Sequence, residues 1–252
     1  MDININDFFW VKNSRANITE ENYKIVEYLV DAAKAFARST YRCVYIIDYC
    51  KRNFAYVSDE FTALCGEPIS KAQNFDHGLY LNHVPRQELE MLTEIHKSGF
   101  EMFSTFPISE RKEYSFQYDF HITRGNKTRL MHHTLTPLTL DSDGKIWLAL
   151  CTISISSRKT PGHLVIGKKG NSAFYQYNLQ NHKWEKQDAI ALSDAEREVL
   201  ILSTQGYTMT DIADVMCKSV DTIKTYKRNL FTKLGVKNIA EALYCAINYK
   251  LI

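Results

Sequence analysis

The chain has 252 residues, of which 45% are hydrophobic and 24% are charged, and its formal net charge is +2. This composition is that of a folded, soluble protein, so it excludes a largely disordered chain. The net charge is too small either to demand or to exclude an anionic partner. Six cysteines are scattered without a Cys-x-x-Cys pair, which favours reduced thiols over a disulfide framework.

No targeting or membrane segment is expected. Residues 1–15 place acidic residues before a short apolar cluster and lack the long hydrophobic run and cleavage site of a signal peptide. No stretch approaches the roughly 18 uninterrupted apolar residues that a membrane helix needs. We therefore expect a cytoplasmic protein.

The first element expected is an amphipathic helix in residues 19–38, within an amino-terminal segment of residues 1–40. Its apolar residues recur at steps of three and four, which is the period of one helical face. Thr19 is a suitable N-cap. This helix either covers the domain that follows or forms a dimer contact, and the sequence leaves both interpretations open.

Residues 41–157 change to the alternation that is typical of strands. The expected order is strands at 43–48 and 54–58, helices at 58–65 and 85–100, and strands at 113–122, 128–140 and 145–156. Turn residues separate the last three strands, so this region is one antiparallel sheet with helices on a face. The fold class of this part is α+β.

The strand at 113–122 is the clearest, because aromatic and polar residues alternate along it. Its aromatic residues share one face: Tyr114, Phe116, Tyr118 and Phe120. They are the candidate lining of a ligand pocket, and an ordinary hydrophobic core is the alternative.

The order of these elements, with the stretches FAYVSDEFTALCGEP and KIWLALCTISIS, resembles a PAS sensory domain. The resemblance implies a five-stranded sheet whose helical face encloses a small-ligand pocket or a signalling surface.

Residues 158–190 are expected to be a linker, because Pro161 and several glycines and lysines interrupt the pattern. Residues 173–177 and 183–186 within it have the alternation of a small β-hairpin. The GKKG stretch at 167–170 lacks the spacing of a phosphate-binding loop, so an exposed turn is favoured.

Residues 191–252 are expected to form four helices joined by short turns. Ser193 with Glu196, and Thr208 with Asp211, have the spacing of capping boxes at helix starts. Looser capping is expected at Asn238, and glycines end the first and third helices.

The third of these helices, residues 219–234, is both apolar and basic. At about 100° per residue, Ile223, Leu230 and Leu234 share a face that must be buried. The opposite face carries Lys224, Thr225, Arg228 and Asn229. These side chains can bind phosphates and base edges, and a merely solvated basic face is the alternative.

The helix that precedes residues 219–234 favours DNA binding over a merely solvated basic face. It joins residues 219–234 through a tight turn at Cys217 and Lys218, and two helices joined in this way form a helix-turn-helix. Lys227 lies in the apolar sector, so we assign it no role in base recognition.

The stretch LSDAEREVLILSTQGYTMTDIADVMCKSVDTIKTYKRNLFTKLGVKNIAEAL resembles the LuxR-type, or GerE-type, DNA-binding domain. The resemblance implies that Lys224, Thr225 and Arg228 enter the major groove of double-stranded DNA. The residues expected to contact phosphates are Lys218, Ser219 and Lys233.

Two positions depart from the family pattern. Tyr226 stands where the family usually has histidine, and Asn238 stands where it often has arginine. The first is expected to alter packing and the second to weaken one backbone contact. Tyr244 and Cys245 face outward on the last helix, where the resemblance implies a homodimer contact.

No catalytic motif is evident, so we expect a protein that is not an enzyme. His132 and His133 are adjacent on a strand and point to opposite faces, so they cannot chelate one metal together. We expect no metal site. His77, His83 and His96 surround the second helix of the sheet domain, where ordinary polar roles are favoured over haem ligation.

The sequence thus predicts a cytoplasmic one-component transcription regulator, a homodimer at least on DNA. Residues 41–157 would receive a signal, with a small-molecule ligand as a candidate partner, and residues 219–234 would bind specific double-stranded DNA. Two alternatives stay open: a redox sensor holding haem or flavin, and a protein-binding adaptor. The sequence leaves the cofactor, the ligand, the operator and the direction of regulation undecided.

Overall fold

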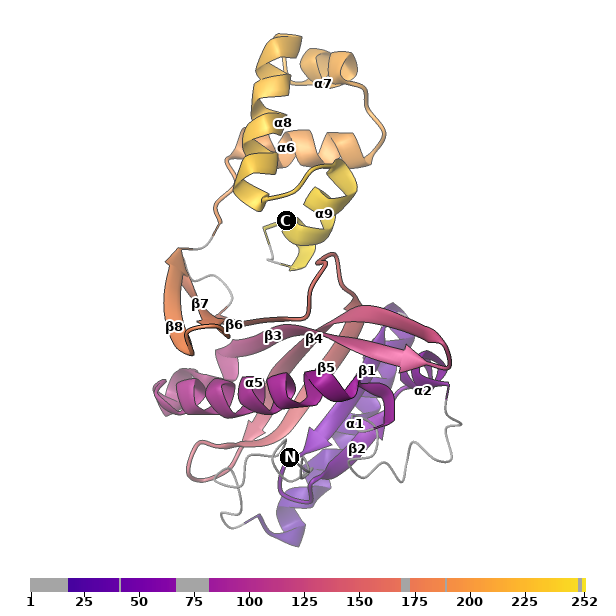
Figure 1. Ribbon diagram of the computed structural model, residues 1–252, viewed down its shortest axis with the longest axis vertical. Coiled ribbons are helices and arrows are strands. Elements are labelled where there is room, and N and C mark those ends of the chain that lie inside the picture. The colour runs from indigo at the N-terminus through magenta and orange to yellow at the C-terminus, as the bar shows by residue number, and fades with distance from the viewer. Residues whose placement is uncertain (1–17, 41, 67–81, 169–172, 189, 249–250) are drawn as a thin grey trace. The chain divides into compact units, whose positions relative to one another are not determined.

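The structure is a computed structural model, and it describes residues 18–40, 42–66, 82–168, 173–188, 190–248 and 251–252. The chain divides into two compact units, residues 1–187 and 188–252 (Figure 1). Three features named above lie outside the described residues: residues 1–15, His77 and residues 169–170 of the GKKG stretch.

Helix α1 (Glu20–Thr40) is the first described element and confirms the amphipathic helix expected there. The hydroxyl of Thr19 accepts the backbone N–H of Asn22 at 3.4 Å, so Thr19 is the N-cap. Ala33 and Ala37 are buried where α1 packs against one face of the sheet. One of the two roles expected for this helix, covering the following domain, is therefore confirmed.

An antiparallel sheet forms the centre of the first unit. Its strands are β1 (Cys43–Asp48), β2 (Asn53–Val57), β3 (Tyr114–Arg124), β4 (Lys127–Leu140), β5 (Ile146–Ile155), β6 (Gly162–Lys168), β7 (Ala173–Asn178) and β8 (Lys183–Asp188). In the described part of the chain their order is β2-β1-β5-β4-β3-β6-β7-β8. The first five strands in this order are the sheet that the sequence predicts.

Strands β6, β7 and β8 correct the expectation that residues 158–190 form a linker. β6 pairs with β3, and Leu164 and Ile166 of β6 are fully buried in the core. Arg158 holds the chain close to the sheet, because its Nε lies 3.4 Å from the buried carboxylate of Asp119. The expected hairpin is present as β7 and β8, but it extends the sheet.

Helices cover both faces of this sheet (Figure 1). Helix α1 lies on one face, and the short α2 (Asp59–Cys65) and the long α5 (Arg86–Ser104) lie on the other. A 3₁₀ helix, η3 (Ile108–Glu113), follows α5. Gly99 lets α5 approach the sheet closely, because a Cβ there would lie 3.1 Å from the ring of Phe116. The main core lies between α5 and the sheet.

The second unit consists of helices in its described part. They are α6 (Asp194–Thr204), α7 (Met209–Val215), α8 (Val220–Leu234) and α9 (Ile239–Asn248). Fully buried Leu200 and Leu230 lie in the cluster shared with α9, and Val199 and Ile223 lie in the cluster shared with α7. The expected fold class, an α+β domain followed by a helical domain, is confirmed. None of the described helices combines the length and apolarity needed to span a bilayer.

Candidate nucleic-acid interface

Helix α7 begins with a complete capping box. The backbone N–H of Asp211 donates to Thr208 Oγ1 at 3.3 Å, and the N–H of Thr208 donates to Asp211 Oδ2 at 2.9 Å. Hydrogen bonds from Thr208 lower the pKa of the Asp211 carboxyl below 3.8, so it is charged at neutral pH. A carboxylate at the N-terminus of the helix also interacts favourably with the positive end of the helix dipole. The helix therefore starts where the sequence predicts.

The turn between α7 and α8 is tight because Cys217 adopts a left-handed backbone conformation, with φ of 51°. The N–H of Lys218 then donates to the carbonyl of Ala213 at 2.9 Å, which closes the end of α7. Ser219 caps the next helix, since its Oγ accepts the N–H of Thr222 at 3.2 Å. These bonds fix the angle at which α8 leaves α7.

The inner face of α8 is buried as expected. Ile223 and Leu230 are fully buried, and Leu234 is 8% exposed. Tyr226 is half-buried against the cluster of α6 and α7, which agrees with a packing role for this position. Lys227 is also half-buried, with Nζ 5.7 Å from the centroid of the Phe231 ring.

The outer face of α8 brings four predicted residues to the surface. Lys224, Thr225, Arg228 and Asn229 are all exposed. Lys224 Nζ lies 3.0 Å from Asp221 Oδ1, but these side chains are 63% and 89% exposed. An ion pair so exposed to water contributes little, so an anionic partner can replace Asp221.

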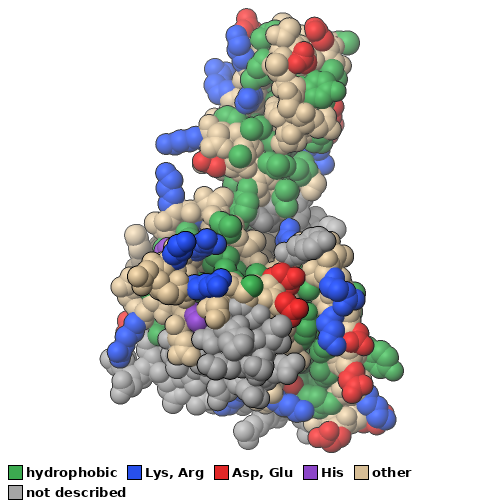
Figure 2. All heavy atoms as spheres, turned by 90° about the vertical axis from the view of Figure 1, so that its right-hand side faces the viewer, with side chains coloured by type: hydrophobic (Ala, Val, Ile, Leu, Met, Phe, Trp, Pro, Cys, Tyr) green, Lys and Arg blue, Asp and Glu red, His purple; other side chains and the backbone are tan. Residues whose placement is uncertain are grey.

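Other basic residues of the second unit add to this surface. Lys218 and Ser219 are exposed at the start of α8, where backbone N–H groups at a helix N-terminus favour phosphate binding. Figure 2 shows Lys and Arg side chains gathered along one edge of the upper, helical unit. The arrangement offers cationic donors to a polyanion.

Lys233 has a different environment from the other predicted contacts. Its Nζ donates to Glu196 Oε2 at 2.7 Å and to the carbonyl of Ala191 at 3.1 Å. Burial alone raises the pKa of Glu196, but hydrogen bonds from Lys233 and Ser193 outweigh it and lower that pKa below 4.5. Lys233 therefore joins the end of α8 to the start of α6, a pairing that the sequence analysis missed.

Tyr244 and Cys245 of α9 are half-buried rather than fully outward-facing. Cys245 packs against the inner cluster that contains Leu200 and Ala246. This corrects the expectation that Cys245 faces outward, because its side chain joins the apolar cluster of the second unit. Their role as a dimer contact stays a prediction.

In the first unit, the four aromatic residues of β3 are buried in the core. Tyr114 stacks on Phe106 with ring centroids 4.0 Å apart, and the hydroxyl of Tyr118 lies 2.8 Å from Nε2 of His96. Of the four, Phe120 lines an internal cavity between the sheet and α2. The other residues that line it are Tyr45, Phe61, Cys65, His83, Val84, Ile122 and Ile153. Its free volume is about 10 Å³, room for about one water molecule.

His133 is a buried polar group close to this cavity. Its Nε2 lies 2.6 Å from the hydroxyl of Tyr45, which lines the cavity, and its ring centroid is 4.6 Å from that of Tyr118. Its Nδ1 has no hydrogen-bond partner among the described residues. Burial, then the neighbouring His96 and His132, holds the pKa of His133 well below 6.5, so the ring is neutral.

The two adjacent histidines point to opposite faces of β4, as the strand alternation predicts. His132 Nδ1 lies 3.1 Å from Asp119 Oδ1, whereas His133 faces the core. Within the described ranges, no three His, Cys, Asp or Glu residues are grouped closely enough to hold a metal. None of the six cysteines, all of which the structure describes, forms a disulfide. Sequence reasoning did not identify His133 as a candidate, although its position on the inner face was predictable.

Comparisons with known proteins concern mainly the second unit. Residues 191–246 match the family described as bacterial regulatory proteins, luxR family. The transcriptional activator protein BglJ of Escherichia coli strain K12 is 38% identical over 66 residues, 26% of this chain and 29% of BglJ. The oxygen regulatory protein NreC of Staphylococcus aureus strain JH9 is 38% identical over 61 residues, 24% of this chain and 28% of NreC. Each similarity thus spans less than a third of the relative.

A solved structure aligns with most of the chain at low similarity. It is the complex of phage VqmA with DPO, at 17% identity, covering 94% of this chain and 93% of that chain, with a TM-score of 0.33. A TM-score this low supports no conclusion about the present chain.

Proposed function

We propose that this chain, whose residues 191–246 form a LuxR-type helix-turn-helix DNA-binding domain, is a transcription regulator that binds specific double-stranded DNA. The observation that carries the proposal is the two-sided character of α8. Its inner face is buried through Ile223 and Leu230, while Lys224 and Arg228 are exposed on the other side. Cytoplasmic location, where the DNA of a bacterial cell lies, is part of the proposal.

The chemistry of the exposed face fits base recognition in the major groove. Arg228 can donate two hydrogen bonds to O6 and N7 of guanine, and Asn229 can pair with adenine. Lys224 and Thr225 lie one turn earlier on the same face and can reach neighbouring bases or phosphates. Lys218 at the turn is placed for a phosphate contact, which would position the helix without reading sequence.

A homodimer on DNA is part of the proposal. A second copy would place a second α8 in the next major groove, about one helical turn away. The operator would then contain two related half-sites. Tyr244 and Cys245 stay the proposed contact of the second unit.

The first unit is the proposed receiver of the signal. The order of its first five strands and the cavity beside α2 support a PAS-like sensory role. Nδ1 of His133 supports a ligand that forms one hydrogen bond, as acceptor or donor according to the tautomer of the ring, because a buried ring nitrogen without a partner is unfavourable. Since the cavity has room for only about one water molecule, aromatic side chains such as Phe120 must move to admit a larger ligand.

Regulation rather than catalysis also agrees with the family, which consists of regulatory proteins. The haem or flavin alternative is tested by a visible absorption spectrum of the purified protein. A colourless protein that still binds its DNA site would exclude a resident haem or flavin.

Selection of bound sites from a random DNA pool tests the proposed function directly. The full chain should enrich sites with two related half-sites, and fluorescence anisotropy should show salt-sensitive binding to them. The double variant Lys224→Ala/Arg228→Ala should lose at least about 30-fold in affinity for the selected site, since each base contact contributes about 1–3 kcal/mol.

A matched control removes a positive charge elsewhere. Lys183→Ala changes an exposed lysine of β8 in the first unit and should leave the affinity unchanged. Unaltered specific binding by the double variant would show that α8 is not the reading helix. Failure of the folded full chain to associate with any DNA would favour the adaptor alternative.

A further inference from the structure

Helix α1 has a second apolar stripe that faces solvent. Ile25, Tyr28 and Phe36 are 45%, 77% and 39% exposed, and they account for three of the nine large hydrophobic side chains exposed in the described residues. Single exposed apolar residues need no explanation, but these three share one helix with exposed Ala32. Their clustering is the feature that requires an account.

The spacing of these residues defines a continuous stripe. At about 100° per residue, positions 25, 28, 32 and 36 fall within about a quarter of the helix circumference. Buried Ala33 and Ala37 lie on a different sector, which packs on the sheet. Half-buried Leu29 lies at the margin between the two. Intervals of three and four residues are the pattern of a helix that packs against another helix.

The charges of α1 are divided between its two halves. Residues 20–31 contain four acidic residues and one basic residue, whereas residues 32–40 contain Lys34 and Arg38 and no acidic residue. Two copies of this helix packed in parallel would place like charges side by side. An antiparallel pair would place the acidic half of each copy beside the basic half of the other.

The stripe is self-complementary in the antiparallel arrangement. Ile25 and Phe36 are equally far from the midpoint between residues 30 and 31, and so are Leu29 and Ala32. Ile25 of one copy would therefore lie beside Phe36 of the other. Leu29 would lie beside Ala32, where the small side chain leaves room.

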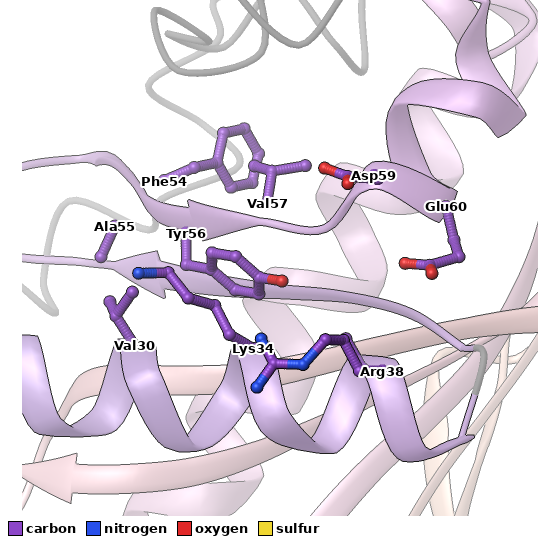
Figure 3. Close-up of a pocket in the computed structure, with 10 residues that line it drawn as sticks. Val30, Lys34, Arg38, Phe54, Ala55, Tyr56, Val57, Asp59 and Glu60 are labelled. Atoms are coloured by element: carbon purple, nitrogen blue, oxygen red, sulfur yellow. The ribbon is translucent and has the colours of Figure 1, made fainter.

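A groove along the flank of α1 is compatible with this arrangement. It has a volume of about 520 Å³ and lies between α1, β2 and the start of α2. Figure 3 shows Lys34 and Arg38 of α1 reaching over Tyr56 of β2, with Asp59 and Glu60 at one end. At about 100° per residue, Lys34 lies on the opposite side of α1 from the stripe and Arg38 lies on its flank, so this groove stays open when the stripe is covered.

We propose that the outer stripe of α1 binds α1 of a second copy of this chain, in an antiparallel orientation. A symmetric dimer uses the same patch on both copies, which this stripe permits. The contact belongs to the first unit and does not depend on DNA binding. It would hold two copies together before they reach an operator.

Sedimentation velocity of the full chain tests the surface. The chain should be a dimer, and Ile25→Lys/Phe36→Lys should raise the dimer dissociation constant at least about 100-fold, because four apolar side chains per dimer are lost from the contact. Ile108→Lys is the control, since Ile108 is an apolar residue of η3 that is 55% exposed. Unchanged circular dichroism would show that each variant is folded.

Disulfide cross-linking tests the orientation. Phe36→Cys and Ile25→Cys chains should cross-link when the two are mixed under mild oxidation. Each variant alone should give no more cross-linked dimer than the unsubstituted chain. The same position in the two copies would lie about 16 Å apart along the helix pair, which is too far for a disulfide. Cross-linking of either variant with itself would indicate parallel packing.

Three outcomes would overturn the proposal. The first is a full chain that is still monomeric at about 100 times the dissociation constant of its operator complex. The second is a dimer that survives the double lysine substitution. The third is cross-linking of either single variant with itself. A monomer whose Tyr28 is protected from chemical modification would assign the stripe to an intramolecular cover such as residues 1–17.

Discussion

The hydroxyl of Tyr177 in β7 donates to Glu94 Oε1 of α5 at 2.9 Å. The same carboxylate oxygen is bound by Nδ1 of His182, in the turn between β7 and β8. Two residues further along α5, His96 binds the buried Tyr118. Helix α5 thus connects the buried aromatic cluster with the strands that directly precede the DNA-binding unit in sequence.

Glu94→Ala should loosen the β7–β8 hairpin, because two hydrogen bonds to one carboxylate are lost. We expect faster amide hydrogen exchange in residues 173–188 and a loss of about 1–3 kcal/mol in unfolding free energy of the first unit. Hydrogen exchange with mass spectrometry measures the first effect. The control is Glu101→Ala, which removes an exposed carboxylate from the same helix. Equal exchange in both variants would contradict this role.

Lys233→Met should destabilise the second unit by about 1–2 kcal/mol at neutral pH, because Glu196 is left buried without its cationic partner. The folded-state pKa of Glu196 lies below 4.5, so its contribution is fully present above that pH and is lost as the pH falls further. Between pH 7 and pH 3, the melting temperature of the variant should therefore fall less than that of the unsubstituted chain.

An exposed lysine in the following turn provides the comparison. Lys237→Met removes the same charge where the side chain is exposed. It should change stability by less than about 0.5 kcal/mol. An equal loss of unfolding free energy in both variants would show that the bond between Lys233 and Glu196 does not stabilise the second unit.

His133 should make the first unit sensitive to acid. Its folded-state pKa is well below 6.5, so the unfolded chain takes up a proton that the folded chain does not. Stability should therefore fall as the pH drops below about 6.5, by up to roughly 1.4 kcal/mol per pH unit from this group. Urea unfolding at pH 7, 6 and 5 measures this slope.

The variant His133→Phe isolates the contribution of that ring. It should be less stable at pH 7, because the hydrogen bond between the buried Tyr45 hydroxyl and the His133 ring is lost. Its slope with pH should be smaller than that of the unsubstituted chain. Burial also lowers the pKa of His163, so some slope should persist. Identical slopes would mean that His133 titrates normally.

Thr208→Ala should cost the second unit about 1 kcal/mol, because the side chain caps α7 and exchanges bonds with Asp211. Thr208→Ser keeps the hydroxyl and should restore most of the loss. Thr210→Ala, an exposed position in the same turn, is the control. Chemical unfolding of the three variants measures the difference, and a similar loss in all three would rule out capping as the cause.

The helical unit could be predicted closely from the sequence because its signals are local. Caps at Ser193 and Thr208 act over three residues, and the two faces of α8 follow from the helical period alone. The contact between Lys233 and Glu196 was missed, since nothing in either stretch indicates a partner 37 residues away.

The order of the first five strands along the chain was predicted, but the extension of the sheet by β6, β7 and β8 was not. Pro161 and Gly162 break the pattern and hide β6, which pairs with the edge of the sheet at Phe116 and its neighbours on β3. The strand alternation places His133 on the inner face, but its contact with Tyr45 spans 88 residues. Sequence patterns assign faces, whereas tertiary packing decides which polar groups meet there.

Methylation interference on the selected DNA site tests the central claim most directly. Methylation of guanine N7 marks the major groove, and it should block binding of the full chain at guanines in two half-sites about one helical turn apart. The variant Arg228→Ala should bind more weakly and lose the interference at one guanine in each half-site. The same interference pattern in both proteins, or interference confined to minor-groove positions, would contradict recognition of the major groove by α8.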